Sequence, residues 1–207
     1  MKKTLKILLT ILLLIAVSFG ISGCKKDEEE ETKSKKDKGN TEVVNTTKND
    51  NDFDDEDEED DDANVSSVGT WNGNVYKNEF LGIKFTMPSS WTKTSDSELM
   101  AQDSSTGDNV IVQFEDLPTG ADAELIYDNL KDQLESLTDM EYDVGSLETE
   151  RFCGKTFKTV KATVSYLGID MVQKYYMLVR GNKAGYIIIT VTDASRLDSV
   201  LSNFSMY

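Results

Sequence analysis

Apolar and polar residues alternate along much of the C-terminal two thirds of the chain, which is the pattern of strands with one face in a core. Residues 83–87 show this period clearly, and the nearly continuous apolar stretch 110–114 predicts a central strand covered on both faces. Three further strands are predicted at residues 159–166, 171–180 and 186–192, with glycine-containing turns at 167–170 and 181–185. Because such short turns join neighbouring strands, the predicted sheet is mostly antiparallel.

Two other stretches show the 3.6-residue period of an amphipathic helix. The first helix is preceded by two candidate capping residues, Thr119 and Asp122. Its apolar stripe consists of Ile126, Leu130, Leu134 and Leu137. The second begins at Asp193, and its apolar stripe consists of Leu197, Val200, Leu201 and Phe204. Helices packed on an antiparallel sheet predict an α+β fold.

The N-terminus has a different pattern. Residues 1–23 contain three lysines, then a short apolar stretch and small residues, which is typical of a signal peptide. A spanning helix needs about 20 apolar residues, more than this stretch offers. The segment ends in Ile21, Ser22, Gly23 and Cys24, which resembles the lipobox of bacterial lipoproteins. The resemblance implies cleavage between Gly23 and Cys24 and a diacylglycerol, with fatty acids such as palmitate, on the Cys24 sulfur.

Charge separates the next segment from the rest. The chain carries a formal net charge of −16, and residues 24–63 contain seven lysines against 18 carboxylates. Their only large apolar side chains are Val43, Val44 and Phe53, too few to offset the entropy of folding. Residues 24–63 are therefore predicted to be a disordered acidic tether, and residues 64–207 a single globular domain.

The most acidic part of this tether lies between Asp50 and Asp62, where eleven of thirteen positions are carboxylates. It is not an EF-hand loop, because Asp57 stands where the loop needs glycine and Ala63 where it needs glutamate. We expect weak, diffuse cation binding there and no defined metal site. The acidic balance also excludes nucleic acid as a partner, since phosphate binding needs a basic surface. No cofactor is predicted, and the absence of histidine removes the commonest metal ligand.

Residues 76–91 carry a second resemblance. Their sequence YKNEFLGIKFTMPSSW resembles the opening of PsbP-like and DcrB-like domains, in which a strand pair leads into an aromatic-x-x-Pro-x-x-Trp turn. The predicted order of elements over about residues 70–207 also follows that family. The resemblance implies a three-layer α/β/α sandwich around a mostly antiparallel sheet. It implies no single activity and no catalytic residue, because the shared motif is scaffold.

Several short motifs fail as catalytic sites. Residues 90–93 match the S-x-x-K nucleophile motif of β-lactamases, but the S-D-N and K-T-G elements that accompany it are missing. Gly154 and Lys155 resemble the end of a Walker A loop whose earlier glycine is absent. Carboxylate pairs such as Glu115 with Asp116, and Glu148 with Glu150, are expected by chance in so acidic a chain. The sequence therefore predicts a protein that is not an enzyme.

Exposed aromatic residues offer the remaining candidate site. Tyr175 and Tyr176 point to opposite faces of a predicted strand, so we expect at least one to be exposed and to form a binding surface with Tyr166. For each single tyrosine, burial in the core is the favoured alternative, because large apolar side chains tend to be buried. Cys153, beside Phe152 in a predicted strand, is expected to be a small buried hydrophobe.

Taken together, these features predict a lipid-anchored binding or accessory module of the cell envelope. It would be held on the extracytoplasmic face of the membrane through the lipid on Cys24 and would bind an envelope protein. Two alternatives remain: an envelope hydrolase using paired carboxylates or a serine hydrogen-bonded to Lys93, and a cation-binding spacer formed by the acidic tether.

Overall fold

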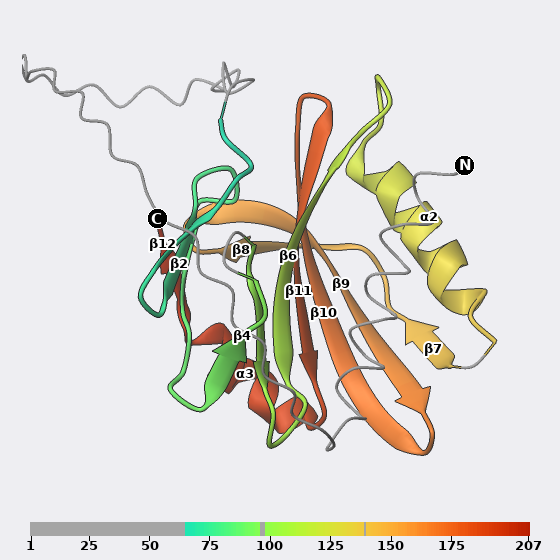
Figure 1. Cartoon of the computed structure of the whole chain (residues 1–207). Helices are drawn as coiled ribbons and strands as arrows, with labels where there is room; N and C mark the ends of the chain where they lie inside the picture. The colour runs from blue at the N-terminus through green and yellow to red at the C-terminus, as the bar shows by residue number, and fades with distance from the viewer. Residues whose placement is uncertain (1–64, 96–97, 139) are drawn as a thin grey trace, which may run out of the picture.

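The computed structural model describes residues 65–95, 98–138 and 140–207. A large antiparallel sheet lies at the centre, between a helix on one side and a small sheet on the other (Figure 1). The large sheet has eight strands, seven of them in the order β4-β5-β6-β11-β10-β9-β7, and β8 pairs separately with β9. They are β4 (Trp91–Lys93), β5 (Met100–Asp103), β6 (Asn109–Asp116), β7 (Glu141–Val144), β8 (Glu148–Phe152), β9 (Lys155–Tyr166), β10 (Ile169–Arg180) and β11 (Lys183–Val191).

Both faces of the large sheet are buried at its centre. Along β10, Tyr175 and Met177 pack into one core, whereas Val172 and Tyr176 pack into the other. The same division by alternate residues occurs in β11, which explains why residues 186–191 are almost all apolar. A strand with two buried faces needs apolar side chains at every position, so its sequence loses the alternation of a half-exposed strand.

The small sheet covers one of these faces. It contains β1 (Thr70–Asn72), β2 (Val75–Asn78), β3 (Ile83–Thr86) and β12 (Phe204–Met206), all antiparallel. The first core lies between the two sheets and includes Phe85, Phe157, Tyr176 and Phe204. Phe85 and Phe204 pack with ring centroids 4.8 Å apart. A one-turn 3-10 helix, η1 (Ala194–Arg196), and the short helix α3 (Leu197–Leu201) complete this layer.

Helix α2 (Ala123–Glu135) packs on the opposite face of the large sheet, against β7 and β10. Asp122 is its N-cap and accepts a hydrogen bond from the backbone N–H of Leu125 at 2.9 Å, as the sequence predicts. Ile126 and Leu134 are the buried members of its apolar stripe. The α+β class and the antiparallel sheet are thus confirmed, with a small sheet and the short helix α3 forming the layer opposite α2.

The second predicted helix is wrong in its extent. Helix α3 ends at Leu201, and Phe204 lies in β12, paired with Phe85 of β3. The periodicity misleads here because Phe204 is directed into the core by strand pairing, not by a further helical turn. Strand β3 offers a free edge to the chain end, and those backbone hydrogen bonds replace the ones that a longer helix would have made.

The aromatic-x-x-Pro-x-x-Trp segment forms the predicted turn. The backbone N–H of Trp91 donates to the carbonyl of Pro88 at 3.0 Å, and β4 begins at Trp91. The Trp91 ring is buried, 6.1 Å from the Phe85 ring. Since β4 is an edge strand of the large sheet, Trp91 closes the inter-sheet core at that edge.

Candidate functional site

Tyr175 and Tyr176 do not form an exposed surface, and that prediction is wrong. Their exposed fractions are 1% and 0%, because α2 covers one face of β10 and the small sheet covers the other. Tyr166, the third residue of the predicted surface, is half-buried against the core on the α2 side. Alternation correctly placed Tyr175 and Tyr176 on opposite faces, but a single strand pattern does not show whether both faces are covered.

Tyr175 belongs instead to a buried polar chain. Its hydroxyl donates to Gln173 Oε1 at 2.7 Å, and Gln173 Nε2 donates to Thr190 Oγ1 at 3.3 Å. Burial raises the pKa of Tyr175 well above its ordinary value, and burial raises the pKa of nearby Tyr142 to about 12. These phenols stay protonated at neutral pH, and the bond from Gln173 to Thr190 joins β10 to β11.

Tyr176 takes part in a second cluster, with Glu150 and Lys174. The Tyr176 hydroxyl donates to Glu150 Oε1 at 3.0 Å, and Lys174 forms an ion pair with Glu150. Lys174 Nζ also lies 5.2 Å from the centroid of the Tyr176 ring, and Phe152 stacks on that ring at 4.4 Å. Burial is the main cause of a strongly raised Tyr176 pKa, and the charge of Glu150 is the second cause. The phenol therefore stays protonated at neutral pH. The cluster fastens β8 to β10.

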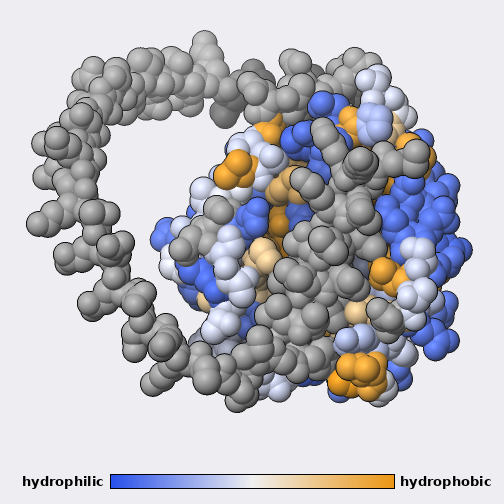
Figure 2. All heavy atoms as spheres, turned by 45° about the vertical axis from the view of Figure 1, so that its right-hand side comes forward, coloured by the Kyte–Doolittle hydropathy of each residue, from blue (hydrophilic) through white to orange (hydrophobic). Residues whose placement is uncertain are grey.

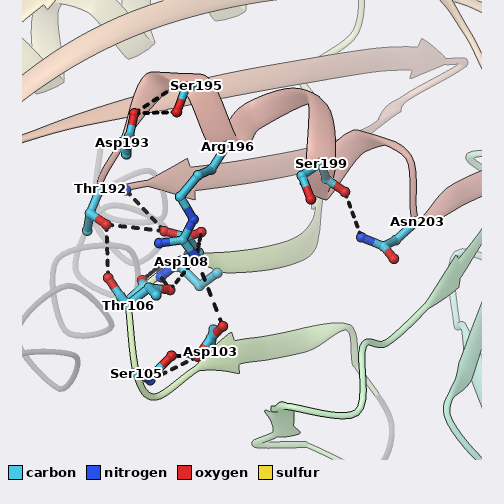
Figure 3. A network of polar contacts seen from close by, with 12 residues as sticks. Asp103, Ser105, Thr106, Asp108, Thr192, Asp193, Ser195, Arg196, Ser199 and Asn203 are labelled. Atoms are coloured by element: carbon cyan, nitrogen blue, oxygen red, sulfur yellow. Dashed lines mark hydrogen bonds and ion pairs between the residues drawn. The ribbon is translucent and has the colours of Figure 1, made fainter.

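The densest polar network joins two loops at one end of the large sheet (Figure 3). Asp108 has an exposed fraction of 1%, and its Oδ2 lies 2.6 Å from Arg196 Nη2. Asp108 Oδ1 accepts from the backbone N–H of Thr192 at 3.1 Å. Arg196 Nη2 also donates to Thr106 Oγ1 at 2.7 Å and lies 4.0 Å from Asp103 Oδ2.

This network connects the turn between β5 and β6 to the segment that follows β11. Asp108 Oδ2 makes no hydrogen bond of good geometry. Its negative charge is instead balanced by the ion pair with the Arg196 guanidinium. That positive charge also disfavours a cation between Asp103 and Asp108. The arrangement is an internal clasp, which we call the Arg196 clasp (Asp103, Thr106, Asp108, Thr192 and Arg196).

Asp103 makes the clasp sensitive to acid. The Ser105 hydroxyl donates to Asp103 Oδ1 at 2.6 Å, and this bond contributes most to a lowered Asp103 pKa, with smaller contributions from backbone bonds and Arg196. A carboxyl group whose pKa is lowered by folding stabilises the folded state at pH values above its unfolded-state pKa of about 3.9. This stabilisation is lost as the pH falls through the lower, folded-state pKa. We expect Ser105→Ala to lower the free energy of unfolding at pH 7, with the difference from the wild type shrinking below about pH 4. Urea unfolding of the full chain at several pH values measures this.

Ser202→Ala is the matched control, because the Ser202 hydroxyl donates to the backbone carbonyl of Ser199 and not to a carboxylate. Its cost should not vary with pH. A Ser105→Ala cost that stays constant from pH 7 to pH 2 would contradict the role assigned to Asp103.

Three of the four carboxylates of the hydrolase alternative are engaged within the fold, and the fourth, Glu148, is exposed at the start of β8. Adjacent residues of a strand point to opposite faces: Glu115 accepts from the Tyr186 hydroxyl, whereas Asp116 pairs with Lys183 at 2.7 Å. Glu150 is held by Lys174 and Tyr176, as described above. Each of these three carboxylates therefore has an internal structural partner.

The serine of the S-x-x-K motif and Cys153 both lie in turns between strands. Ser90 is exposed in the turn before β4, and Lys93 Nζ lies over the Trp71 ring, 5.5 Å from its centroid. Cys153 is half-buried in the turn between β8 and β9 with a φ of 50°, so its predicted position in a strand is wrong. Burial raises the pKa of the Cys153 thiol to about 11, which leaves little thiolate at neutral pH.

Sequence reasoning missed the Arg196 clasp and the role of Lys174. Asp108 and Arg196 come from loops far apart in the chain and match no motif, so only the register of β6 on β11 brings them together. Lys174 reaches Glu150 because both β8 and β10 pair with β9.

Other predictions concern residues beyond this part of the chain. The proposed lipidation site Cys24 and the acidic run from Asp50 to Asp62 lie outside the described residues. Among residues 65–95, 98–138 and 140–207, no group of three or more potential metal ligands is found. In the same ranges, no helix is both long and apolar enough to cross a bilayer.

Comparisons with known proteins give structural likenesses only. No protein-family profile matches the sequence, and no curated protein matches it significantly. A cyanobacterial PsbP (CyanoP) from Synechocystis is similar at 14% identity and a TM-score of 0.45, over 70% of this chain and 96% of that one. A protein from Bacteroides thetaiotaomicron is similar at 14% identity and a TM-score of 0.41, over 66% and 49%. LpqN, involved in cell envelope biogenesis of Mycobacterium tuberculosis, is similar at 10% identity and a TM-score of 0.39, over 60% and 82%.

Proposed function

We propose that the protein is a lipid-anchored, extracytoplasmic binding or accessory module of the cell envelope, without catalytic activity. The observation that carries the proposal is the lipobox-like sequence from Ile21 to Cys24 at the end of a signal-like segment. A diacylglycerol on Cys24 supplies two acyl chains, and two chains anchor a protein stably where one does not.

The acidic tether supports the same proposal. Its like charges favour an extended chain, and 40 residues at about 3.3 Å each reach on the order of 130 Å. Such a tether would hold the folded domain away from the bilayer and within reach of a partner in the envelope.

The internal chemistry of the folded domain is consistent with a binding role. Its buried tyrosines keep their protons, and Asp108, Glu115 and Glu150 contact Arg196, Tyr186 and Lys174 respectively. These groups stabilise loops and strands. Binding would then be a property of the outer surface of the domain, which would contact the partner.

A pull-down of the tagged full chain from solubilised membranes tests this function. We expect recovery of a defined envelope protein that resists washing with salt, because a specific interface is largely apolar at its centre. The matched control is a chain that keeps residues 1–63 and lacks the folded domain. Recovery of only salt-labile material, in equal amounts with both baits, would contradict the proposal and point to the acidic tether.

A further inference from the structure

The β9–β10 hairpin ends in an unusual turn. Leu167 and Gly168 form its two-residue loop, both with positive φ (51° and 78°), which is the geometry of a type I′ turn. Asn or Gly is the ordinary residue at the first position, because a left-handed backbone strains a residue with a large side chain. Leu167 adopts this conformation with its side chain 80% exposed. The strained leucine is therefore not explained by packing within the chain.

A second apolar residue adjoins the turn. Ile169 has an exposed fraction of 37%, and its strand partner in the register is Tyr166. The hydrophobic spheres at the lower edge of Figure 2 lie at the same edge as the end of this hairpin in Figure 1. The turn thus presents a small apolar knob, which we call the hairpin tip (Leu167, Gly168 and Ile169).

The rim of the hairpin tip is acidic. Asp170 and Glu141 are exposed and both are register partners of Ser165, so the two carboxylates lie in one row across β10, β9 and β7. The Ser165 hydroxyl donates to Asp170 and holds it in that row. The nearest lysine on β9, Lys161, lies four residues back, on the order of 13 Å along the strand.

The position of the hairpin tip bears on what it contacts. The coloured part of the chain begins at the upper left of Figure 1, and the end of the β9–β10 hairpin lies at the lower right. The tip therefore faces away from the point where the tether enters the domain. The acidic rim also disfavours binding to the negatively charged surface of a membrane. Both observations favour a partner in the aqueous space.

We infer that the hairpin tip inserts into an apolar socket of a partner protein whose rim carries lysine or arginine side chains. This deepens the proposed function, on which it rests, by naming the contact surface. Leu167 is the apolar anchor, and Asp170 and Glu141 face the basic rim. The backbone strain at Leu167 fits such a role, since strained residues concentrate where a structure contacts its ligands.

Photo-crosslinking of the full chain in the cells that make it tests the inference. A benzophenone amino acid at position 169 is expected to give one discrete protein adduct. Both Leu167→Asn and Asp170→Lys should reduce that adduct about tenfold, the effect of losing an anchor residue of an interface. The matched control is the same probe at position 182, in the two-residue turn between β10 and β11, which should not give this adduct.

The melting temperature of the Leu167→Asn variant distinguishes a binding role of Leu167 from a structural one. Because asparagine tolerates the left-handed conformation, Leu167→Asn should raise the melting temperature of the full chain, by about 2–4 °C. A lower melting temperature for Leu167→Asn, or an adduct that survives both substitutions, would overturn the inference. An adduct with the mass of a phospholipid or of a second copy of this chain would also overturn it. Adducts are scored in membrane and soluble fractions separately, so a failed anchor is distinguished from a failed contact.

Discussion

Replacing Cys24 by serine is expected to leave the chain as an unprocessed precursor without lipid. In the lipobox the acceptor of the diacylglyceryl group is a cysteine sulfur, and a thiolate is far more nucleophilic than a serine hydroxyl. The lipobox resemblance implies a peptidase that cleaves only the lipidated chain between Gly23 and Cys24, so we expect residues 1–23 to be retained. Gel mobility and metabolic labelling with a palmitate analogue measure this directly. Mobility and label are the proper readouts, because an uncleaved apolar segment can itself keep a precursor in the membrane.

Cys153→Ser is the matched control for that experiment, since Cys153 is the only other cysteine. Its thiol lies half-buried in the β8–β9 turn, and burial raises its pKa to about 11. We expect this variant to be processed and labelled like the wild type. Normal processing and labelling of Cys24→Ser, or loss of label in Cys153→Ser alone, would show that the lipobox interpretation is wrong.

Much of the fold could be predicted because strand and helix signals are local. The turn at Leu167 and Gly168 joins two strands as expected, and Asp122 caps α2 as expected. Phe204 shows the limit of a local signal: its spacing fits a helix, yet it pairs with Phe85 in the small sheet. Burial by a distant strand is a property of the whole fold, and a helical period in a short C-terminal stretch does not reveal it.

The candidate sites were harder to predict for the same reason. The burial of Tyr175 and Tyr176 depends on two separate layers, formed by α2 and by strands from both ends of the domain. The hairpin tip is different, because the Leu167-Gly168 pair in a turn position is visible in the sequence. That this turn could bind a partner is recognised only from the structure, which shows the positive φ of Leu167 and the exposure of its side chain.

The Arg196 clasp also shows how polar side chains can fix loops that strand pairing leaves open. Asp108 and Thr192 lie just beyond the ends of β6 and β11, where ladder hydrogen bonds stop. Asp108 accepts from the backbone N–H of Thr192, and Arg196 neutralises the carboxylate. A buried ion pair of this kind is worth little relative to an apolar pair, but it is costly to break from one side.

Arg196→Met should therefore destabilise the domain by about 2–4 kcal/mol, since it leaves the Asp108 carboxylate buried without a counter-charge. This is less than the usual cost of about 3–5 kcal/mol, because the Arg196 side chain is 32% exposed and water reaches it. Adding Asp108→Asn should recover part of the loss, because the amide carries no charge and its oxygen still accepts from Thr192. Urea unfolding of the three full-length chains measures these differences.

The control for this comparison is the ion pair between Lys183 and Asp116, whose side chains are 33% and 78% exposed. Lys183→Met removes a cation in the same way but leaves Asp116 in water, and we expect it to cost less than about 1 kcal/mol. The contrast depends on the burial of the carboxylate left behind, 1% exposed for Asp108, and not on the loss of a positive charge. Equal costs for the two substitutions would mean that Asp108 is stabilised by Thr192 alone, and the Arg196 clasp would then have no energetic role.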